Sequence, residues 1–455
     1  MRYSFFALAA LVACWAGEAR AQADLSNLTC SPSAEVNASV SWPQTDPVWT
    51  FDMVRPSATQ TGTATRGTGL EIRDVYYKGR KVFDRAHSPI LNVEYDEGAG
   101  CNCFRDWQDT EVGYAADGVL PGAFDCFAQA TAGVVQTTCE LPEGGDAGSF
   151  TGIALEDYGD ELVITAHMSA SWYRYRVKWH FYADGRIWPE YSFAAASAAC
   201  TDAAHRHHAY WRFDFDLEGT PGNDVVREFG PTGETVFTEE ADRTWGAPTD
   251  GVYWSVTDED AGVGYLIEPS SEDLRLPVDD FSKTDALVLR YKMDEIADGI
   301  TIGTGCEFEY DDQNWVNDES LVGEDIVFWY RSSALHEAGN PWECDVVGPT
   351  LRPQGYLVSS EPAAAAMRSV EVQAAAPNPA STTSTVRFRV ADEQSVRATL
   401  LDALGREVRV LFEGPLRAGR YETLRIDGSD LPVGTYVVRV DGERGAASTR
   451  IAIVR

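Results

Sequence analysis

Short stretches in which apolar and polar residues alternate recur from Trp49 onward, and this alternation limits the fold more than any other feature of the sequence. Such alternation is typical of β-strands that bury one face. Glycine, aspartate and proline separate the stretches, and Asp184-Gly185 is a pair that favours a hairpin turn. Long amphipathic helical periods are missing. The chain is therefore predicted to be all-β. The clearest alternating stretches are 69–80, 161–166, 173–181, 210–217, 251–256 and 286–293.

A change of composition near residue 358 predicts two β domains. Residues 24–357 carry most of the alternating stretches and are predicted to form a large β-sandwich. Residues 358–369 (VSSEPAAAAMRS) are rich in small residues and are interpreted as a linker. Residues 370–455 contain seven short strand-like stretches, which predict a small seven-stranded β-sandwich.

The first 23 residues are interpreted as an export signal. Arg2 supplies the positive start, residues 5–15 form a short apolar run, and Ala19-Arg20-Ala21 fits a small-residue cleavage site. Lipidation at Cys14 is the alternative, because residues 11–14 (LVAC) resemble a lipoprotein processing box. No later stretch reaches the length of a transmembrane helix.

Removal of the signal leaves an even number of cysteines, which in an exported protein suggests disulfides. Cys126 and Cys139 would close a short loop and are the pair we expect to be bridged. Cys101-Asn-Cys103 could instead belong to a metal site, but no second pair follows at zinc-finger spacing. The eight cysteines are Cys30, Cys101, Cys103, Cys126, Cys139, Cys200, Cys306 and Cys344.

The sequence is strongly acidic, with a formal net charge of -34 and a pI near 4.5. Such a surface repels phosphate, so nucleic acid is excluded as a partner. The acidity is explained mainly as an adaptation for solubility. Acidic side chains would favour cationic substrates only if they lined the binding site.

Residues 205–219 (HRHHAYWRFDFDLEG) combine three histidines with a strand-like run. If the strand begins at His205, then His205 and His207 point to the same side. Two imidazoles held side by side on a strand are suitable ligands for Cu(II) or Zn(II). The alternative is a solvated polar run that also includes His208.

The tail contains motifs that resemble the C-terminal sorting domain of the type 9 secretion system. They are Pro377-Asn-Pro379, residues 402–408 (DALGREV), residues 431–436 (LPVGTY) and a basic end. The resemblance implies that the type 9 secretion machinery is a partner and that the protein is secreted or held at the cell surface. An ordinary adhesive sandwich is the alternative.

Three segments of the large domain resemble the catalytic domain of copper amine oxidases. Residues 171–187 (SWYRYRVKWHFYADGRI) match a tyrosine strand followed by a W-x-F-x-x-D-G-x-I hairpin. Residues 205–219 match H-x-H followed by an acidic strand, and residues 325–353 match D-x-V-x-W, a histidine and L-x-P. The resemblance implies the supersandwich fold of that family.

The same resemblance assigns roles to individual residues. Tyr173 would be the precursor of topaquinone. The three copper ligands would be His205, His207 and His336, and a peripheral calcium site would contain Asp214, Asp216 and Asp325. The ligand His336 lies far from His207 in sequence, so it must come from a different strand.

The general base is assigned from residues 107–113 (WQDTEVG), which match the family motif if one residue is deleted. Asp109 would then be the base, and Trp107 would replace the tyrosine that gates the cofactor. Asp106 is an alternative base. A solvated acidic turn is the structural alternative.

Together these assignments imply an exported oxidase that uses copper and topaquinone. A primary amine and dioxygen would give an aldehyde, ammonia and hydrogen peroxide, and the family's dimers imply a homodimer. Trp172 and Arg174 depart from the family, which has asparagine and an acidic residue beside the tyrosine. On a strand both point away from the face of Tyr173. This direction leaves Tyr173 open to oxidation. The two substitutions themselves favour the alternative, a non-catalytic β-sandwich protein of the cell surface, with or without a bound metal.

Overall fold

The structure is a computed structural model. It describes residues 22–23, 35–55, 70–95, 104–107, 127–132, 135, 137, 139, 153–170, 173–195, 204–243, 251–270, 273, 284–292, 316–336, 344, 346–356, 370–372, 375, 378–390, 394–402, 406–416, 422–429, 431–442 and 445–455. Within these residues the regular structure is β-strand, apart from the 3-10 turn η2 (Leu217–Gly219). The all-β prediction is therefore confirmed. No helix among the described residues is long and apolar enough to cross a membrane.

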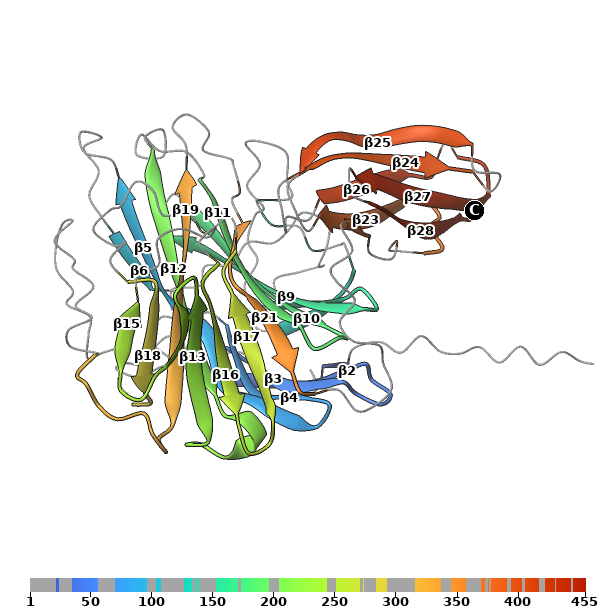
Figure 1. The fold of residues 1–455 in the computed structure, drawn as a ribbon. Coiled ribbons are helices and arrows are strands. Elements are labelled where there is room, and N and C mark those ends of the chain that lie inside the picture. Colours follow the sequence, from blue (N-terminus) through green and yellow to red (C-terminus); the bar gives the residue numbers. More distant parts are fainter. Residues whose placement is uncertain are drawn as a thin grey trace, which may run out of the picture.

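The large domain consists of two antiparallel sheets that face each other (Figure 1). In the first sheet the described strands lie in the order β1 (Gln22–Ala23), β2 (Val36–Trp42), β3 (Trp49–Arg55), β4 (Glu71–Tyr77), β5 (Arg80–Tyr95), β12 (His205–Phe215), β19 (Ile326–His336), β18 (Ala286–Arg290) and β15 (Ala241–Arg243). Strand β6 (Phe104–Trp107) pairs with β5 off this path. Strands from distant parts of the sequence, β5, β12 and β19, thus lie side by side.

The second sheet supplies the opposite layer. Its described strands lie in the order β14 (Gly233–Val236), β13 (Asp224–Gly230), β16 (Tyr253–Asp258), β17 (Val263–Glu268), β21 (Thr350–Gln354), β11 (Ile187–Ala195), β10 (Tyr173–Tyr182), β9 (Glu161–Ala170), β8 (Ile153–Asp157) and β7 (Phe127–Thr131). Strand β20 (Val346–Val347) pairs with β11. Among the described strands of this sheet, only the short pair β7 and β8 is parallel.

Large aromatic side chains fill the space between the two sheets. The rings of Trp179 in β10 and Trp211 in β12 meet edge to face with centroids 5.5 Å apart, and both side chains are fully buried. Phe51 in β3 stacks on Phe181 in β10 at 4.5 Å. Each residue occupies an alternating inward position, so the sequence alternation directly determines which side chains enter this core.

The tail forms a second, smaller sandwich with its own hydrophobic cluster. One sheet contains β22 (Val370–Val372), β23 (Thr383–Val390) and β26 (Glu422–Asp427). The other contains β25 (Glu407–Leu416), β24 (Gln394–Leu401), β27 (Gly434–Gly442) and β28 (Gly445–Ile453). These seven described strands agree with the predicted seven-stranded sandwich. The proposed linker 358–369 lies outside the described residues, so the domain boundaries stay a prediction.

The two sandwiches touch through arginines of β23. Arg387 Nη1 lies 3.8 Å from Glu161 Oε2, and the Arg389 guanidinium lies 5.3 Å from the centre of the Tyr182 ring. Glu161 and Tyr182 are at the end of the β9–β10 hairpin that is remote from Tyr173. The small domain therefore contacts the large one far from the predicted copper residues.

The disulfide differs from the bridge predicted between Cys126 and Cys139. Cys139 is bonded to Cys344, which precedes β20, and Cys126 lies outside the described residues. The prediction was wrong because short separation in sequence says little about which segments a β-sandwich brings together. Here the pairing of β20 with β11 places Cys344 beside the chain at Cys139.

A buried ion pair on the outer side of β19 gives a test of the fold. Arg331 and Asp285 are bonded to each other, and their side chains are 1% and 0% exposed. Asp285→Ala would leave a buried guanidinium without its main carboxylate partner, so we expect a loss of about 3–5 kcal/mol of unfolding free energy. Chemical denaturation of the full chain measures this loss. The double variant Arg331→Met/Asp285→Leu should recover most of the lost unfolding free energy, because it leaves no buried charge without a partner. If the double variant is destabilised as much as Asp285→Ala, the unpaired guanidinium is not the cause of the loss.

Candidate metal and cofactor site

Strand pairing brings the three histidines of the predicted copper site together. His205 at the start of β12 is directly opposite His336 at the end of β19. His205 and His207 share the inner face of β12 because they are two residues apart. All three side chains are at most 1% exposed. The site therefore depends on the antiparallel register of two strands that are far apart in sequence.

The three imidazole rings form a compact group. The centroid of the His205 ring lies 4.7 Å from that of His336 and 5.1 Å from that of His207. His205 and His336 are nearly parallel, with planes 15° apart. Among the residues that the structure describes, no set of three histidine, cysteine, aspartate or glutamate side chains is already arranged to hold a metal ion.

Tyr173 reaches this group from the opposite sheet. It is the first residue of β10, and its hydroxyl oxygen lies 2.8 Å from Nε2 of His205. Its ring also meets that of His207 edge to face at 4.6 Å. Tyr175 shares the inner face of β10 and stacks on Tyr173 at 5.6 Å. A phenol is thus held in hydrogen-bond contact with one imidazole and in ring contact with a second.

Burial makes His207 a neutral imidazole. Burial first, and then the neighbouring His205 and His336, hold the pKa of His207 well below its usual range. Neither ring nitrogen of His207 has a hydrogen-bond partner among the described residues, although both are buried. Neutral imidazole is the form that binds metals, and two buried nitrogens without partners are costly unless something binds them. The chemistry of this donor set therefore fits copper.

Phe193 is a member of the site that the sequence motifs did not indicate. It lies on β11, and its ring stacks on that of His207 with centroids 3.5 Å apart. The same ring is 6.1 Å from Tyr173 and 5.4 Å from His336. The alternation of Tyr191 and Phe193 along β11 predicts an inward position for Phe193, but only the packing of the two sheets shows which side chains it touches.

The structure describes the backbone of the predicted gate, Trp107, and of the alternative base, Asp106, but not the predicted base, Asp109. Trp107 ends β6, where its backbone pairs with Ile90 of β5. Asp106 belongs to the same strand and pairs with Leu91, so both residues lie two strands away from β12. Asp109 and Trp172 lie outside the described residues. Arg174 is half-buried, and its guanidinium donates a hydrogen bond to the backbone oxygen of Tyr173.

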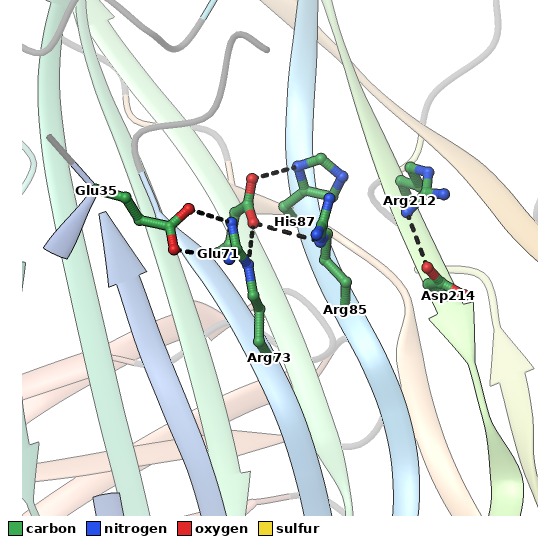
Figure 2. A network of polar contacts seen from close by, with 7 residues as sticks. All are labelled: Glu35, Glu71, Arg73, Arg85, His87, Arg212 and Asp214. Atoms are coloured by element: carbon green, nitrogen blue, oxygen red, sulfur yellow. Dashed lines mark hydrogen bonds and ion pairs between the residues drawn. The ribbon is translucent and has the colours of Figure 1, made fainter. Parts of the chain in front are cut away.

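The residues predicted for calcium lie at the other end of β12, about 30 Å from the histidines at the usual rise per strand residue. Asp214 Oδ2 is 3.4 Å from Nη1 of the fully buried Arg212. Figure 2 shows this pair beside a second network, in which Glu71 contacts Arg73, Arg85 and His87. Asp214 thus already has a cationic partner.

Asp216 has a cationic partner as well. Its Oδ2 lies 2.9 Å from the Lys81 ammonium. Burial alone would lower the pKa of Lys81, but hydrogen bonds to Asp216 and Asp84 hold it above its usual range. Burial, and then the carboxylates of Asp216 and Asp84, raise the pKa of Asp325 to about 6. Two of the three predicted ligands are paired with cations, so the set does not fit a calcium ion as it stands.

Comparison with solved structures shows which known fold the large domain resembles. A copper-containing benzylamine oxidase from Hansenula polymorpha is similar with a TM-score of 0.50 at 15% identity, over 70% of this chain and 60% of that one. This likeness confirms the amine-oxidase type of β-sandwich, and at such identity it shows the fold alone. An amine oxidase from Aspergillus nidulans matches with TM-score 0.47 and 16% identity (70% and 51% covered). A lysyl oxidase from Pichia pastoris matches with TM-score 0.49 and 14% identity (84% and 56% covered).

The tail is identified independently. Residues 375–454 match the family model of the secretion system C-terminal sorting domain. The match confirms the predicted sorting domain, and with it export through the type 9 system to the secreted or cell-surface fraction. No curated protein matches the chain in sequence.

Proposed function

We propose that the large domain is a copper- and topaquinone-dependent oxidase of primary amines, exported by means of its sorting domain. The observation that carries the proposal is the contact of the buried Tyr173 hydroxyl with His205, inside a group of three buried histidines. His205, His207 and His336 would hold the copper. Copper with dioxygen would supply the oxidation of Tyr173, and the quinone that results would supply the oxidation of the amine to an aldehyde.

The residues of the chain have separate tasks in this proposal. His205 accepts the hydrogen bond of the Tyr173 hydroxyl and so orients the phenol toward the histidines. Phe193 and Tyr175 enclose the phenol with aromatic surface and exclude water from it. Asp109 would take the proton from the α-carbon of the amine, with Trp107 at the entrance. A carboxylate that lay in a closed, apolar site would have a raised pKa, which would suit proton removal near neutrality.

A non-catalytic, metal-binding protein of the cell surface is the second candidate. It is favoured by the Phe193 ring, which lies against the face of His207 and limits how that imidazole can turn. In this alternative the sandwich would keep its histidines but would not produce a quinone. The homodimer implied by the family resemblance remains a prediction in both cases.

Release of hydrogen peroxide tests the proposal. The full chain, loaded with copper in air and given benzylamine or an aliphatic primary amine, should release peroxide, ammonia and aldehyde in equal amounts. The same protein stripped by a copper chelator should release none, because the oxidation depends on the metal. Absence of peroxide from a protein with one copper bound per chain, for every amine tried, would favour the second candidate.

A further inference from the structure

A lysine side chain lies at the acidic end of the first sheet, where the family resemblance implies a calcium ion. The Lys81 ammonium is 2.9 Å from Asp216 Oδ2, 2.9 Å from Asp84 Oδ1 and 3.6 Å from Asp74 Oδ1. Its side chain is 14% exposed, so the stem is largely buried along β5. One ammonium is therefore surrounded by three carboxylates.

The backbone fixes this arrangement. Asp216 follows the last residue of β12, and its amide donates a hydrogen bond of 3.1 Å to the backbone oxygen of Val82, the residue after Lys81. The two side chains are thus brought together by neighbouring, hydrogen-bonded strands. A contact held at both ends by sheet structure loses little further conformational entropy when it forms.

A calcium ion would compete with this ammonium. Calcium takes six to eight oxygen ligands, and its affinity depends on how many negatively charged ligands it keeps. Binding through Asp216 would place a divalent cation within a few ångströms of a fixed positive charge, which repels it. Asp214 is already paired with Arg212, so it does not offer a free replacement.

We propose that the Lys81 ammonium occupies the peripheral cation position of this sandwich, so that the folded protein needs no calcium there. The proposal is independent of the copper chemistry, because it concerns the opposite end of β12. It also gives the buried Asp216 carboxylate a cationic partner without a metal.

Calcium titration of the full chain tests the proposal. The melting temperature of the natural protein should be the same in calcium and in a calcium chelator. Lys81→Met removes the ammonium and leaves Asp74, Asp84 and Asp216 without it. This variant should melt at a lower temperature in chelator and regain stability with calcium, with an affinity at least about tenfold above that of the natural protein.

Arg80→Met is the matched control. Arg80 is the adjacent residue, but its guanidinium pairs with Glu218 at 2.6 Å, so its loss should create no response to calcium. Stoichiometric calcium binding that raises the melting temperature of the natural protein would overturn the proposal. A folded Lys81→Met variant that ignores calcium would also overturn it. If that variant does not fold, the titration of the natural protein alone decides.

Discussion

Replacement of Tyr173 by phenylalanine is expected to give a folded protein that binds copper but never develops a visible absorption band. The change removes only the hydroxyl that contacts His205 Nε2, and loss of one such hydrogen bond costs about 1 kcal/mol. The aromatic packing against Tyr175 and Phe193 stays. The oxidation itself should be lost completely, because the variant has no phenol hydroxyl at the position that contacts His205.

Tyr175→Phe is the control for this experiment. Tyr175 has the same burial and stacks on Tyr173, and its ring lies 5.9 Å from that of His207. The variant should develop the band at a similar rate, and phenylhydrazine should shift the band as in the natural protein. A band that survives in Tyr173→Phe, or disappears only in Tyr175→Phe, would show that a different residue is oxidised.

Removal of one histidine is expected to have the largest effect on copper binding. His207→Ala should lower the affinity for Cu(II) by at least about a hundredfold, the upper range seen when only supporting residues of a metal site are changed. The reason is that His207 provides buried ring nitrogens with no other partner in the structure. Isothermal titration and electron paramagnetic resonance of the full chain measure the affinity and the nitrogen ligands.

His208→Ala separates metal binding from the general cost of losing a buried imidazole. His208 is adjacent on β12 and equally buried, but it faces the other side of the sheet and bonds to Ser333 Oγ at 2.8 Å. This variant should bind copper as the natural protein does. Equal loss of affinity in both variants would mean that the copper is bound elsewhere or that β12 has been disturbed.

The alternation in the sequence was enough to predict which residues share a face. It placed His205 with His207 on one side of a strand and Tyr173 with Tyr175 on one side of another, as the structure has them. A period of two residues determines this locally, whatever the strand pairs with. A different signal, the change of composition to small residues at 358–369, predicted the division into two β domains, and the boundaries stay a prediction.

Contacts between distant strands could not be predicted in this way. The register that sets His336 opposite His205 depends on the pairing of β12 with β19, and the stacking of Phe193 on His207 depends on the packing of one sheet on the other. The Cys139–Cys344 bridge likewise depends on a pairing between distant segments, that of β20 with β11. Lys81 had no sequence signal, since a lysine between alternating residues is usually a solvated side chain.

Peptide mass spectrometry of the copper-loaded full chain, kept in air, tests the central claim most directly. The account predicts that the peptide containing Tyr173 gains two oxygen atoms and loses two hydrogen atoms, and that the peptide from an anaerobic sample does not change. An unmodified Tyr173 in an aerated protein with one copper bound per chain would contradict the oxidase assignment.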